Sequence, residues 1–258
     1  NKDSSKELFL LIIKRVSNLE TLNEDDFKLL IHENSLLVKT GESKSLCSTD
    51  KIERNKAIEE HKEWIEVAKS IGCKAIRVNL WSNNMSAEEV KNISQESLGE
   101  LLEFSNKIDM SIVIENHGGY TSDAKWLVDL IKSINHSNLG TLPDFGTRNF
   151  CVKTAPKKQG EMFGGKCIDQ YDKYKGVEQL LPYAMGISAK SHSFDDDGEE
   201  NSTNYSKMIN LIKSSRFKGH IAIEYEGANL GMYSLNKSKY LSANDGILAT
   251  KKLIEKYI

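Results

Sequence analysis

Cysteine is scarce in this chain, and its few occurrences are far apart in the sequence. Cys47, Cys73, Cys151 and Cys167 form no Cys-x-x-Cys pair, which argues against a zinc knuckle and against a disulfide scaffold. In a domain of this size the pattern predicts free thiols in a reducing compartment. Cys73 lies just before an apolar run and is expected to be a small core residue.

Long apolar runs are also missing. The longest, "LFLLII" at residues 8–13, is far shorter than the roughly 20 residues that a helix needs to cross a bilayer. The sequence therefore predicts no membrane-spanning segment, and a cytoplasmic protein is expected. Residue 1 is Asn and not Met, so an upstream signal stays open at this point.

No long run of Lys or Arg stands out in the chain. The 35 basic and 37 acidic residues are mixed along the sequence and give a net charge of −2, so no footprint for nucleic acid is visible. With 258 residues the chain is long for one β-sandwich and suits one α/β barrel. No repeat, linker or change in composition interrupts it, so residues 1–258 are expected to form a single domain.

Short apolar runs alternate with longer helical patterns from residue 36 onward. The expected strands cover residues 35–40, 75–81, 111–116, 140–145, 186–192 and 220–226. The expected helices cover residues 56–71, a segment opened by the capping box Ser86-x-x-Glu89, and residues 122–134, 176–183, 205–214 and 244–257. Such alternation predicts βαβ units and a parallel sheet.

Two segments fit this pattern less well. In the first 34 residues, "LFLLIIKRV" could be strand or helix and "NEDDFKLLIHEN" resembles a helix, so an eight-stranded barrel would have an incomplete or remodelled N-terminal part. Residues 148–165 lack periodicity and are expected to form a long loop after a strand end. A loop that covers the substrate and a plain surface insertion both remain open for this segment.

Charged side chains stand at the ends of four successive expected strands. They are Glu115, Asp144, Lys190 with His192, and Glu224 with Glu226 beyond it. All strands of a parallel barrel open onto the same face, so these residues are expected to converge there. Carboxylates gathered in this way repel one another unless a cation lies among them. Oxygen-rich ligation with at most one His favours Mn²⁺, Mg²⁺ or Co²⁺, with Zn²⁺ still open.

The strand at residues 75–81 carries further candidates for the site. Arg77 lies inside an apolar strand and must pair with another group; a salt bridge to a carboxylate such as Glu115 is slightly favoured over a clamp on a substrate oxygen. Asn79 ends the strand and is a candidate for substrate binding. Trp81 lies just beyond, where it could wall a sugar site or serve only in packing.

His117 is a candidate for substrate binding on the next strand. It is followed by Gly118 and Gly119, which let the backbone approach closely and leave the ring exposed. We therefore expect His117 to face the site.

The motifs resemble a known family. "GCKAIRVNLW", "IVIENHGG", "LGTLPDFGTRNF", "YDKYKGVEQLLPYAMGISAKSHSFD" and "IAIEYEG" are similar, in order, to the later strands of the xylose isomerase-like TIM barrel superfamily. This is the sugar phosphate isomerase/epimerase group, which also includes endonuclease IV. The resemblance covers the chain from about residue 36 to its end. It implies a (β/α)8 TIM barrel.

The resemblance also implies a site. A divalent metal would be held by Glu115, Asp144, Glu224 and a residue on the strand of Lys190 and His192. The two glutamates would also exchange the substrate proton. The chain departs from the family at the third ligand: many members place a His about two residues before the Lys, where this chain has Ser188. His192 could reach the metal from a shifted position, or the metal could keep three protein ligands.

Three functional hypotheses follow. The first is a metal-dependent isomerase or epimerase of a sugar or sugar phosphate, which acts through an enediolate. In it Glu115 and Glu224 are the acid/base pair, Lys190 or His117 polarises a substrate oxygen, and Arg77 orients the substrate. The second is a sugar-binding barrel without activity, or a lyase of the inosose dehydratase type.

The third hypothesis is an endonuclease IV-type phosphodiesterase, which needs several His ligands for zinc and a DNA-binding surface. The slightly acidic charge balance and the few histidines at strand ends make it the weakest of the three. The expected partner is a small sugar, with neither nucleic acid nor membrane. A homodimer is expected because barrels of this kind often pair.

Overall fold

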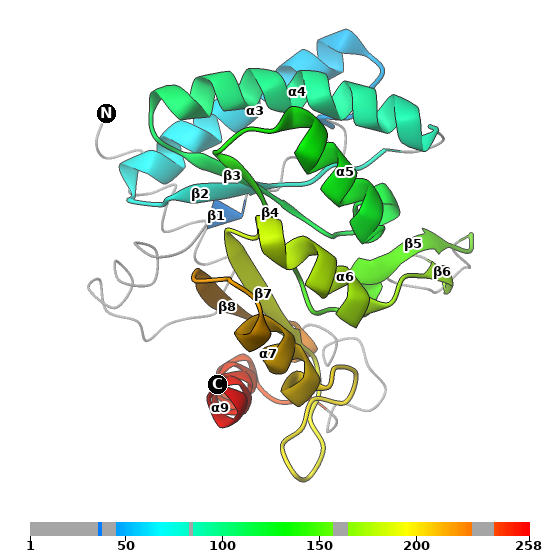
Figure 1. Ribbon diagram of the computed structural model, residues 1–258, viewed down its shortest axis with the longest axis vertical. Helices are drawn as coiled ribbons and strands as arrows, with labels where there is room; N and C mark the ends of the chain where they lie inside the picture. The colour runs from blue at the N-terminus through cyan, green and yellow to red at the C-terminus, as the bar shows by residue number, and fades with distance from the viewer. Residues whose placement is uncertain (1–35, 38–44, 83–84, 157–164, 229–239) are drawn as a thin grey trace.

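The protein is an α/β barrel built around parallel strands (Figure 1). The computed structural model describes residues 36–37, 45–82, 85–156, 165–228 and 240–258. Within these ranges one sheet has the order β1-β2-β3-β4, and β7 pairs in parallel with β8. The bounds are β1 Leu36–Leu37, β2 Ala75–Val78, β3 Ser111–Glu115, β4 Leu139–Leu142, β7 Gly186–Ser191 and β8 His220–Tyr225. The strands expected from residue 75 onward and the expected fold class are confirmed.

The two sheets are joined side by side between β4 and β7. Parallel bridges connect Thr141 with Ala184 and Asp144 with Ser188. The backbone amide of Ser188 donates to the carbonyl of Pro143 at 2.9 Å, and its carbonyl accepts from the amide of Phe145 at 3.1 Å. All these strands run in the same direction, so their carboxyl ends meet along one edge of the combined sheet.

Helices alternate with the strands as the sequence predicts. They are α3 (Lys51–Ser70), α4 (Ala87–Lys107), α5 (Ala124–Ile134), α6 (Lys173–Leu180), α7 (Tyr205–Ser214) and α9 (Ala243–Tyr257). Short 3-10 turns are η1 (Gly119–Ser122), η2 (Arg148–Phe150) and η3 (Leu181–Tyr183). Ser86 and Glu89 form the expected capping box of α4. Asp50 caps α3 in the same way, by accepting from backbone amides that lack a partner within the helix.

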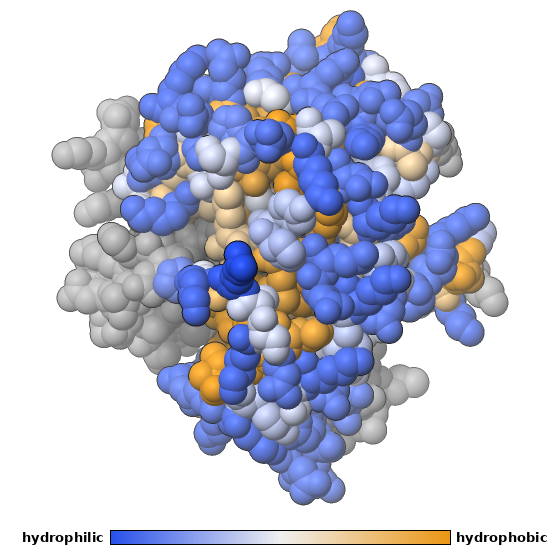
Figure 2. Space-filling model, viewed as in Figure 1, coloured by the Kyte–Doolittle hydropathy of each residue, from blue (hydrophilic) through white to orange (hydrophobic). Residues whose placement is uncertain are grey.

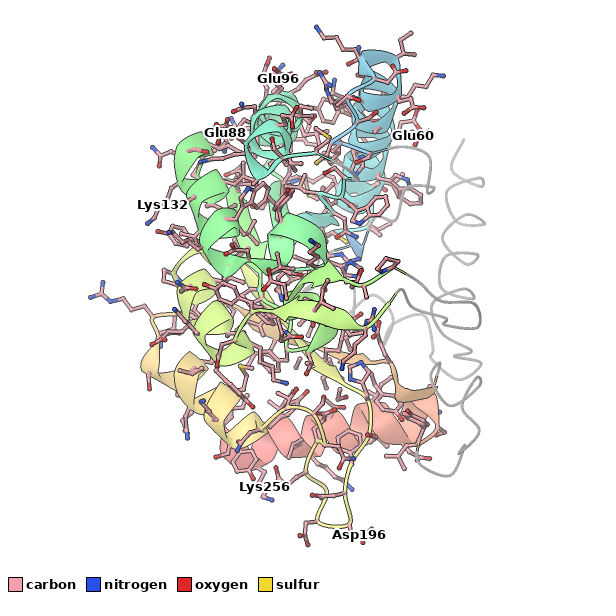
Figure 3. All side chains as sticks on the ribbon, turned by 90° about the vertical axis from the view of Figure 1, so that its right-hand side faces the viewer. Glu60, Glu88, Glu96, Lys132, Asp196 and Lys256 are labelled. Atoms are coloured by element: carbon pink, nitrogen blue, oxygen red, sulfur yellow. A yellow bond between two sulfur atoms is a disulfide. The ribbon has the colours of Figure 1, made fainter. Side chains whose placement is uncertain are left out.

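The core lies between the strands and the inner faces of these helices. β2 is buried along its whole length and β3 from Ile112 onward, which fits strands covered on both faces. Cys73 is buried in the core, as expected, and takes part in no disulfide. The outward faces of the helices are mainly hydrophilic (Figure 2). Charged side chains such as Glu88, Glu96 and Lys132 project from them into solvent (Figure 3).

A two-stranded hairpin corrects two expectations. Residues 148–165, expected to be one irregular loop, contain η2 and the strand β5 (Cys151–Thr154), which pairs antiparallel with β6 (Cys167–Gln170). This pairing brings Cys151 and Cys167 to a Cα–Cα distance of 5.8 Å, and the two form a disulfide. The prediction of free thiols is therefore wrong for this pair, and the expectation of a reducing compartment loses that support. Cys47 and Cys73 take part in no disulfide.

The N-terminal expectations cannot be placed on the structure. The segments "LFLLIIKRV" and "NEDDFKLLIHEN" lie outside the described residues, as does most of the strand expected at residues 35–40. Across the part of the chain that is described, no helix combines the length and the apolar character that a membrane crossing requires.

Candidate metal and acid/base site

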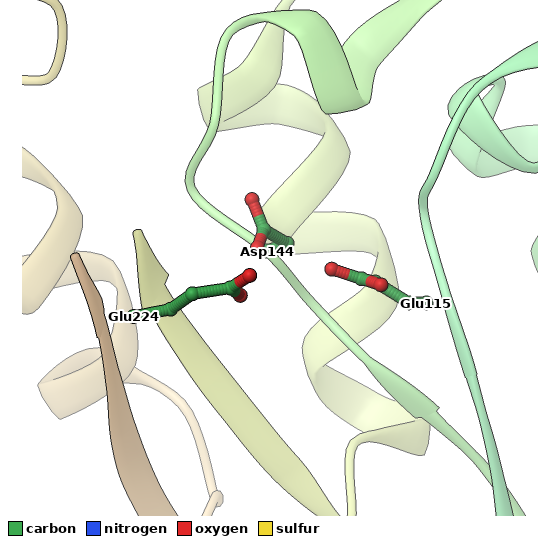
Figure 4. A group of neighbouring side chains, drawn as sticks. All are labelled: Glu115, Asp144 and Glu224. Carbon is green, nitrogen blue, oxygen red and sulfur yellow. The ribbon is translucent and has the colours of Figure 1, made fainter. Parts of the chain in front are cut away.

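Three carboxylates converge where the parallel strands end. Glu115 is the last residue of β3, Asp144 follows β4, and Glu224 lies near the end of β8. One oxygen from each of the three lies within 4.8 Å of the other two (Figure 4). Glu115 and Asp144 are fully buried, whereas the Glu224 side chain is 33% exposed. The sequence-predicted convergence is confirmed, and we call these residues the carboxylate triad.

Glu115 is held by two donors. The Arg77 guanidinium, on the neighbouring strand β2, forms a buried ion pair with Glu115 Oε2. Asn149 Nδ2 donates to the other oxygen at 3.2 Å. The expected salt bridge of Arg77 is therefore confirmed. Arg77 Nε is also buried and has no hydrogen-bond partner among the described residues.

Asp144 is fixed by its own loop and by β3. The amide of Gly146 donates to Asp144 Oδ1 at 2.6 Å, and the side chain of Asn116 bridges to the backbone of Asp144 and Asn149. A Cβ added to Gly146 would lie 2.8 Å from Asp144 Oδ1 and 2.9 Å from Lys190 Cδ, so only glycine fits there. Burial raises the pKa of Asp144, more than the attraction of Lys190 lowers it.

Lys190 lies among the carboxylates. Its ammonium on β7 is 3.3 Å from Asp144 Oδ2, 3.3 Å from Glu224 Oε1 and 3.5 Å from Glu226 Oε1. The side chain is 3% exposed. Burial lowers the pKa of Lys190, but the attraction of the three carboxylates outweighs it and raises the pKa above its ordinary value. Lys190 is therefore a protonated, buried cation within the site.

Ser188 takes the position at which the family pattern has a histidine. Its hydroxyl donates to Glu224 Oε2 at 2.7 Å. A hydroxyl can orient this carboxylate, but it is a weaker metal ligand than imidazole or carboxylate. Together with Lys190, Ser188 accounts for the contacts that the structure gives to the Glu224 side chain.

His192 points to a different pair of carboxylates. Its Nε2 is 3.4 Å from Glu226 Oε2, and its Nδ1 is 3.8 Å from Glu200 Oε1. Burial lowers the pKa of His192, but hydrogen bonds to Glu200 and Glu226 raise it to about 9. At neutral pH the ring is therefore an imidazolium. It is not one of the residues that the geometry groups with the triad.

The candidates for substrate binding lie around this group. His117 is exposed, and Gly118 and Gly119 adopt φ values of 94° and 58°, as the turn after β3 requires. Partial loss of solvent, with repulsion from Arg77 and Lys190, lowers the pKa of His117, so the ring is neutral.

Two candidates follow β2. Asn79 Oδ1 is buried and has no hydrogen-bond partner among the described residues. The Trp81 side chain is 52% exposed, so it is not a core residue, and its carbonyl accepts a hydrogen bond from Ser45.

Several residues of the site were not predicted from the sequence. They are Asn116, Gly146, Asn149, Ser188 and Glu200, each of which contacts or orients a charged group named above. Asn116 and Gly146 stand next to predicted residues, in "IVIEN" and "PDFG", and that proximity is the signal that could have found them. Asn149 and Glu200 lie in segments with no periodic pattern.

A family model describing the xylose isomerase-like TIM barrel matches residues 14–253. The chain belongs to this family. No curated protein matches it at the level of sequence.

Solved structures share the fold at low sequence identity. A D-tagatose 3-epimerase-like protein has a TM-score of 0.61 and 18% identity, over 94% of this chain and 85% of that protein. The D-allulose 3-epimerase from Methylomonas sp., in complex with D-allulose, has a TM-score of 0.67 and 12% identity, with coverage of 91% and 80%. The IolI protein with a bound zinc atom has a TM-score of 0.58 and 16% identity, with coverage of 93% and 84%. At these identities the likeness supports the fold.

Proposed function

We propose that this protein is a sugar isomerase or epimerase that removes a proton from a carbon atom of an open-chain sugar and returns it to the neighbouring carbon or to the opposite face of the same carbon. The observation that carries the proposal is the carboxylate triad, in which three side chains from three strands approach within 4.8 Å at the carboxyl edge of the barrel. Two fold neighbours, a D-tagatose 3-epimerase-like protein and a D-allulose 3-epimerase in complex with D-allulose, support it.

The donor set fits a divalent metal ion. Among the described residues, Asp144 Oδ2 is buried without a hydrogen bond and forms an ion pair with the Lys190 ammonium. When all groups are ionised, the carboxylates of the site outnumber its basic groups by two. The carboxylates are Glu115, Asp144, Glu200, Glu224 and Glu226, and the basic groups are Arg77, Lys190 and His192.

We assign Glu115, Asp144 and Glu224 as metal-holding residues, and His192 as a ligand only if it leaves its two carboxylates. The all-oxygen donors favour Mn²⁺, Mg²⁺ or Co²⁺, and zinc in a fold neighbour keeps Zn²⁺ open. When bound, the ion supplies a Lewis acid that polarises the carbonyl and the adjacent hydroxyl of the sugar.

Glu224 is the group best placed to move the proton. Its side chain is 33% exposed and can reach a bound sugar, whereas the Glu115 side chain is fully buried. The Glu224 carboxylate would take the proton from the carbon next to the carbonyl. The C–H electrons then form the C=C bond of an enediolate, and the carbonyl oxygen takes the negative charge. Return of the proton to the neighbouring carbon, together with transfer of the hydroxyl proton from the second oxygen to the first, isomerises the sugar.

Epimerisation requires that a proton return to the opposite face of the same carbon. That step needs a second acid, and Glu115 is the candidate across the triad from Glu224 (Figure 4). Lys190 and the neutral His117 are candidates to stabilise the developing oxyanion, while Asn79 and Trp81 are candidates to contact the sugar. Because Glu115 is fully buried and Glu224 is partly exposed, the geometry favours isomerisation through Glu224 alone.

The test is proton exchange with solvent. Wild-type protein and E224Q are incubated with free ketoses and aldoses in D₂O with saturating Mn²⁺, and loss of the C–H signal is followed by NMR. E224Q is expected to be slower by about 10²–10⁴-fold, because a general base is lost. The matched control is E96Q, which alters a glutamate that pairs with Arg54 on the helical surface.

Full activity in E224Q would refute its role as the base. Wild-type protein that binds sugars without exchanging a proton would instead support a sugar-binding barrel without activity. That second candidate is favoured by the two basic side chains that already pair with the triad.

A further inference from the structure

The Lys190 ammonium lies where it contacts two of the three triad carboxylates. Its Nζ is 3.3 Å from Asp144 Oδ2 and 3.3 Å from Glu224 Oε1. A small divalent ion binds carboxylate oxygens at about 2.1 Å and needs their lone pairs directed at it. An ammonium on the same oxygens would be in strong electrostatic repulsion with such an ion. The ammonium and a metal ion that both engage Asp144 and Glu224 would therefore repel each other and compete for these carboxylates.

Glu226 offers the ammonium another partner. Its Oε1 is 3.5 Å from Lys190, and it is not one of the triad carboxylates. The imidazolium of His192 holds the other oxygen of Glu226 at 3.4 Å. Glu200, which accepts from the backbone amides of His192, Ser202 and Thr203, in turn fixes the ring. Glu226 is thus held by His192 next to Lys190, and its side chain is 42% exposed.

We propose that Lys190 is an internal cation that occupies the carboxylate site in the metal-free protein and competes with the divalent ion for it. When a metal binds, the ammonium gives up Asp144 and Glu224 and keeps Glu226. This inference rests on the metal site of the proposed function and adds a regulator of metal affinity. It assigns His192 a positioning role through Glu226 in place of a ligand role.

The test is metal affinity, measured by titration calorimetry with Mn²⁺ on wild-type protein and on K190M. Removal of the competing charge is expected to tighten Mn²⁺ binding by about tenfold or more. The matched control is K62M. Lys62 also bridges two carboxylates, Glu59 at 2.8 Å and Glu100 at 2.7 Å, but on the helical surface, so its loss is expected to leave Mn²⁺ affinity unchanged.

A second variant keeps the test decisive if K190M does not fold without metal. K190Q removes the charge and retains donors that can bond Asp144 and Glu224, and it is expected to show the same direction of change. Affinity equal to or weaker than wild type in K190Q overturns the proposal, as does the absence of Mn²⁺ binding in every variant.

The outcome is separate from that of the proposed function. An active protein whose Lys190 variants bind Mn²⁺ no more tightly rejects only this inference. A protein that shows the tightening but exchanges no sugar proton rejects the isomerase and leaves the inference standing.

Discussion

Arg77 and Glu115 form the buried ion pair on which the site depends. The Arg77 side chain is 8% exposed and that of Glu115 is fully buried, and they come from neighbouring strands. Taking two charges out of water is costly, and the cost is recovered only while each charge keeps its partner. The intact pair therefore contributes little to the net free energy of folding, whereas removal of one member is strongly destabilising.

We expect R77M to destabilise the fold by about 3–5 kcal/mol, because it leaves the Glu115 carboxylate buried without its cation. Urea denaturation at neutral pH measures the change. The control is K107M, which breaks a pair with Glu103 on the exposed surface of α4 and is expected to have little effect. A loss in R77M no larger than that in K107M would contradict the expectation.

Ion pairs of His192 connect the segment after β7, which contains Glu200, to Glu226 beyond β8. His192 extends from the end of β7 and contacts Glu200 in this segment and Glu226 beyond β8. Burial lowers the pKa of His192, but these carboxylates raise it from 6.5 to about 9. The interactions therefore stabilise the protonated ring in the folded state. This stabilisation is fully present below pH 6.5 and is lost as the pH rises through about 9.

A pH titration of stability tests this coupling. The free energy of unfolding of wild-type protein, minus that of H192Q, is expected to be largest near pH 6. It should fall by on the order of 2 kcal/mol towards pH 10. Chemical denaturation of both proteins in the presence of a chelator gives the two curves. A difference that stays constant over this range would show that His192 does not gain its proton from the fold.

Over the whole molecule, the triad joins the two described sheets. Glu115 and Asp144 come from the ends of β3 and β4, and Glu224 comes from β8. A ligand that bridges them can bind only when both sheets are assembled, so its binding free energy adds to the stability of the folded state.

We expect Mn²⁺ at about 100 times its dissociation constant to stabilise the protein by about 2.7 kcal/mol and to raise Tm by roughly 5–10 °C. Differential scanning calorimetry with Mn²⁺, and after its removal by EDTA, measures the shift. D144N serves as the control, since its remaining oxygen can still accept from the Gly146 amide while one ligand charge is lost. An equal shift in D144N, or none in the wild type, would count against a metal held by the triad.

Much of the fold was predictable because it depends on local pattern. The β-branched and aliphatic runs of β2 and β3, and the capping box at Ser86, act over a few residues and appear in the structure as expected. The hairpin was missed because β5 and β6 are short and neither alternates clearly. Its disulfide depends on that pairing, so it was missed as well.

The sequence by itself determined which side chains stand at the carboxyl ends of the strands, because strand direction and topology bring those ends to one edge. Tertiary structure alone decided their partners. Arg77 and Glu115 are 38 residues apart, and Ser188 and Glu224 are 36 apart, so these contacts depend on the register between strands. That register places Lys190 among the residues of the carboxylate triad and directs His192 to Glu200 and Glu226. Sequence spacing does not predict which side chains pair, because pairing depends on distances across the sheet.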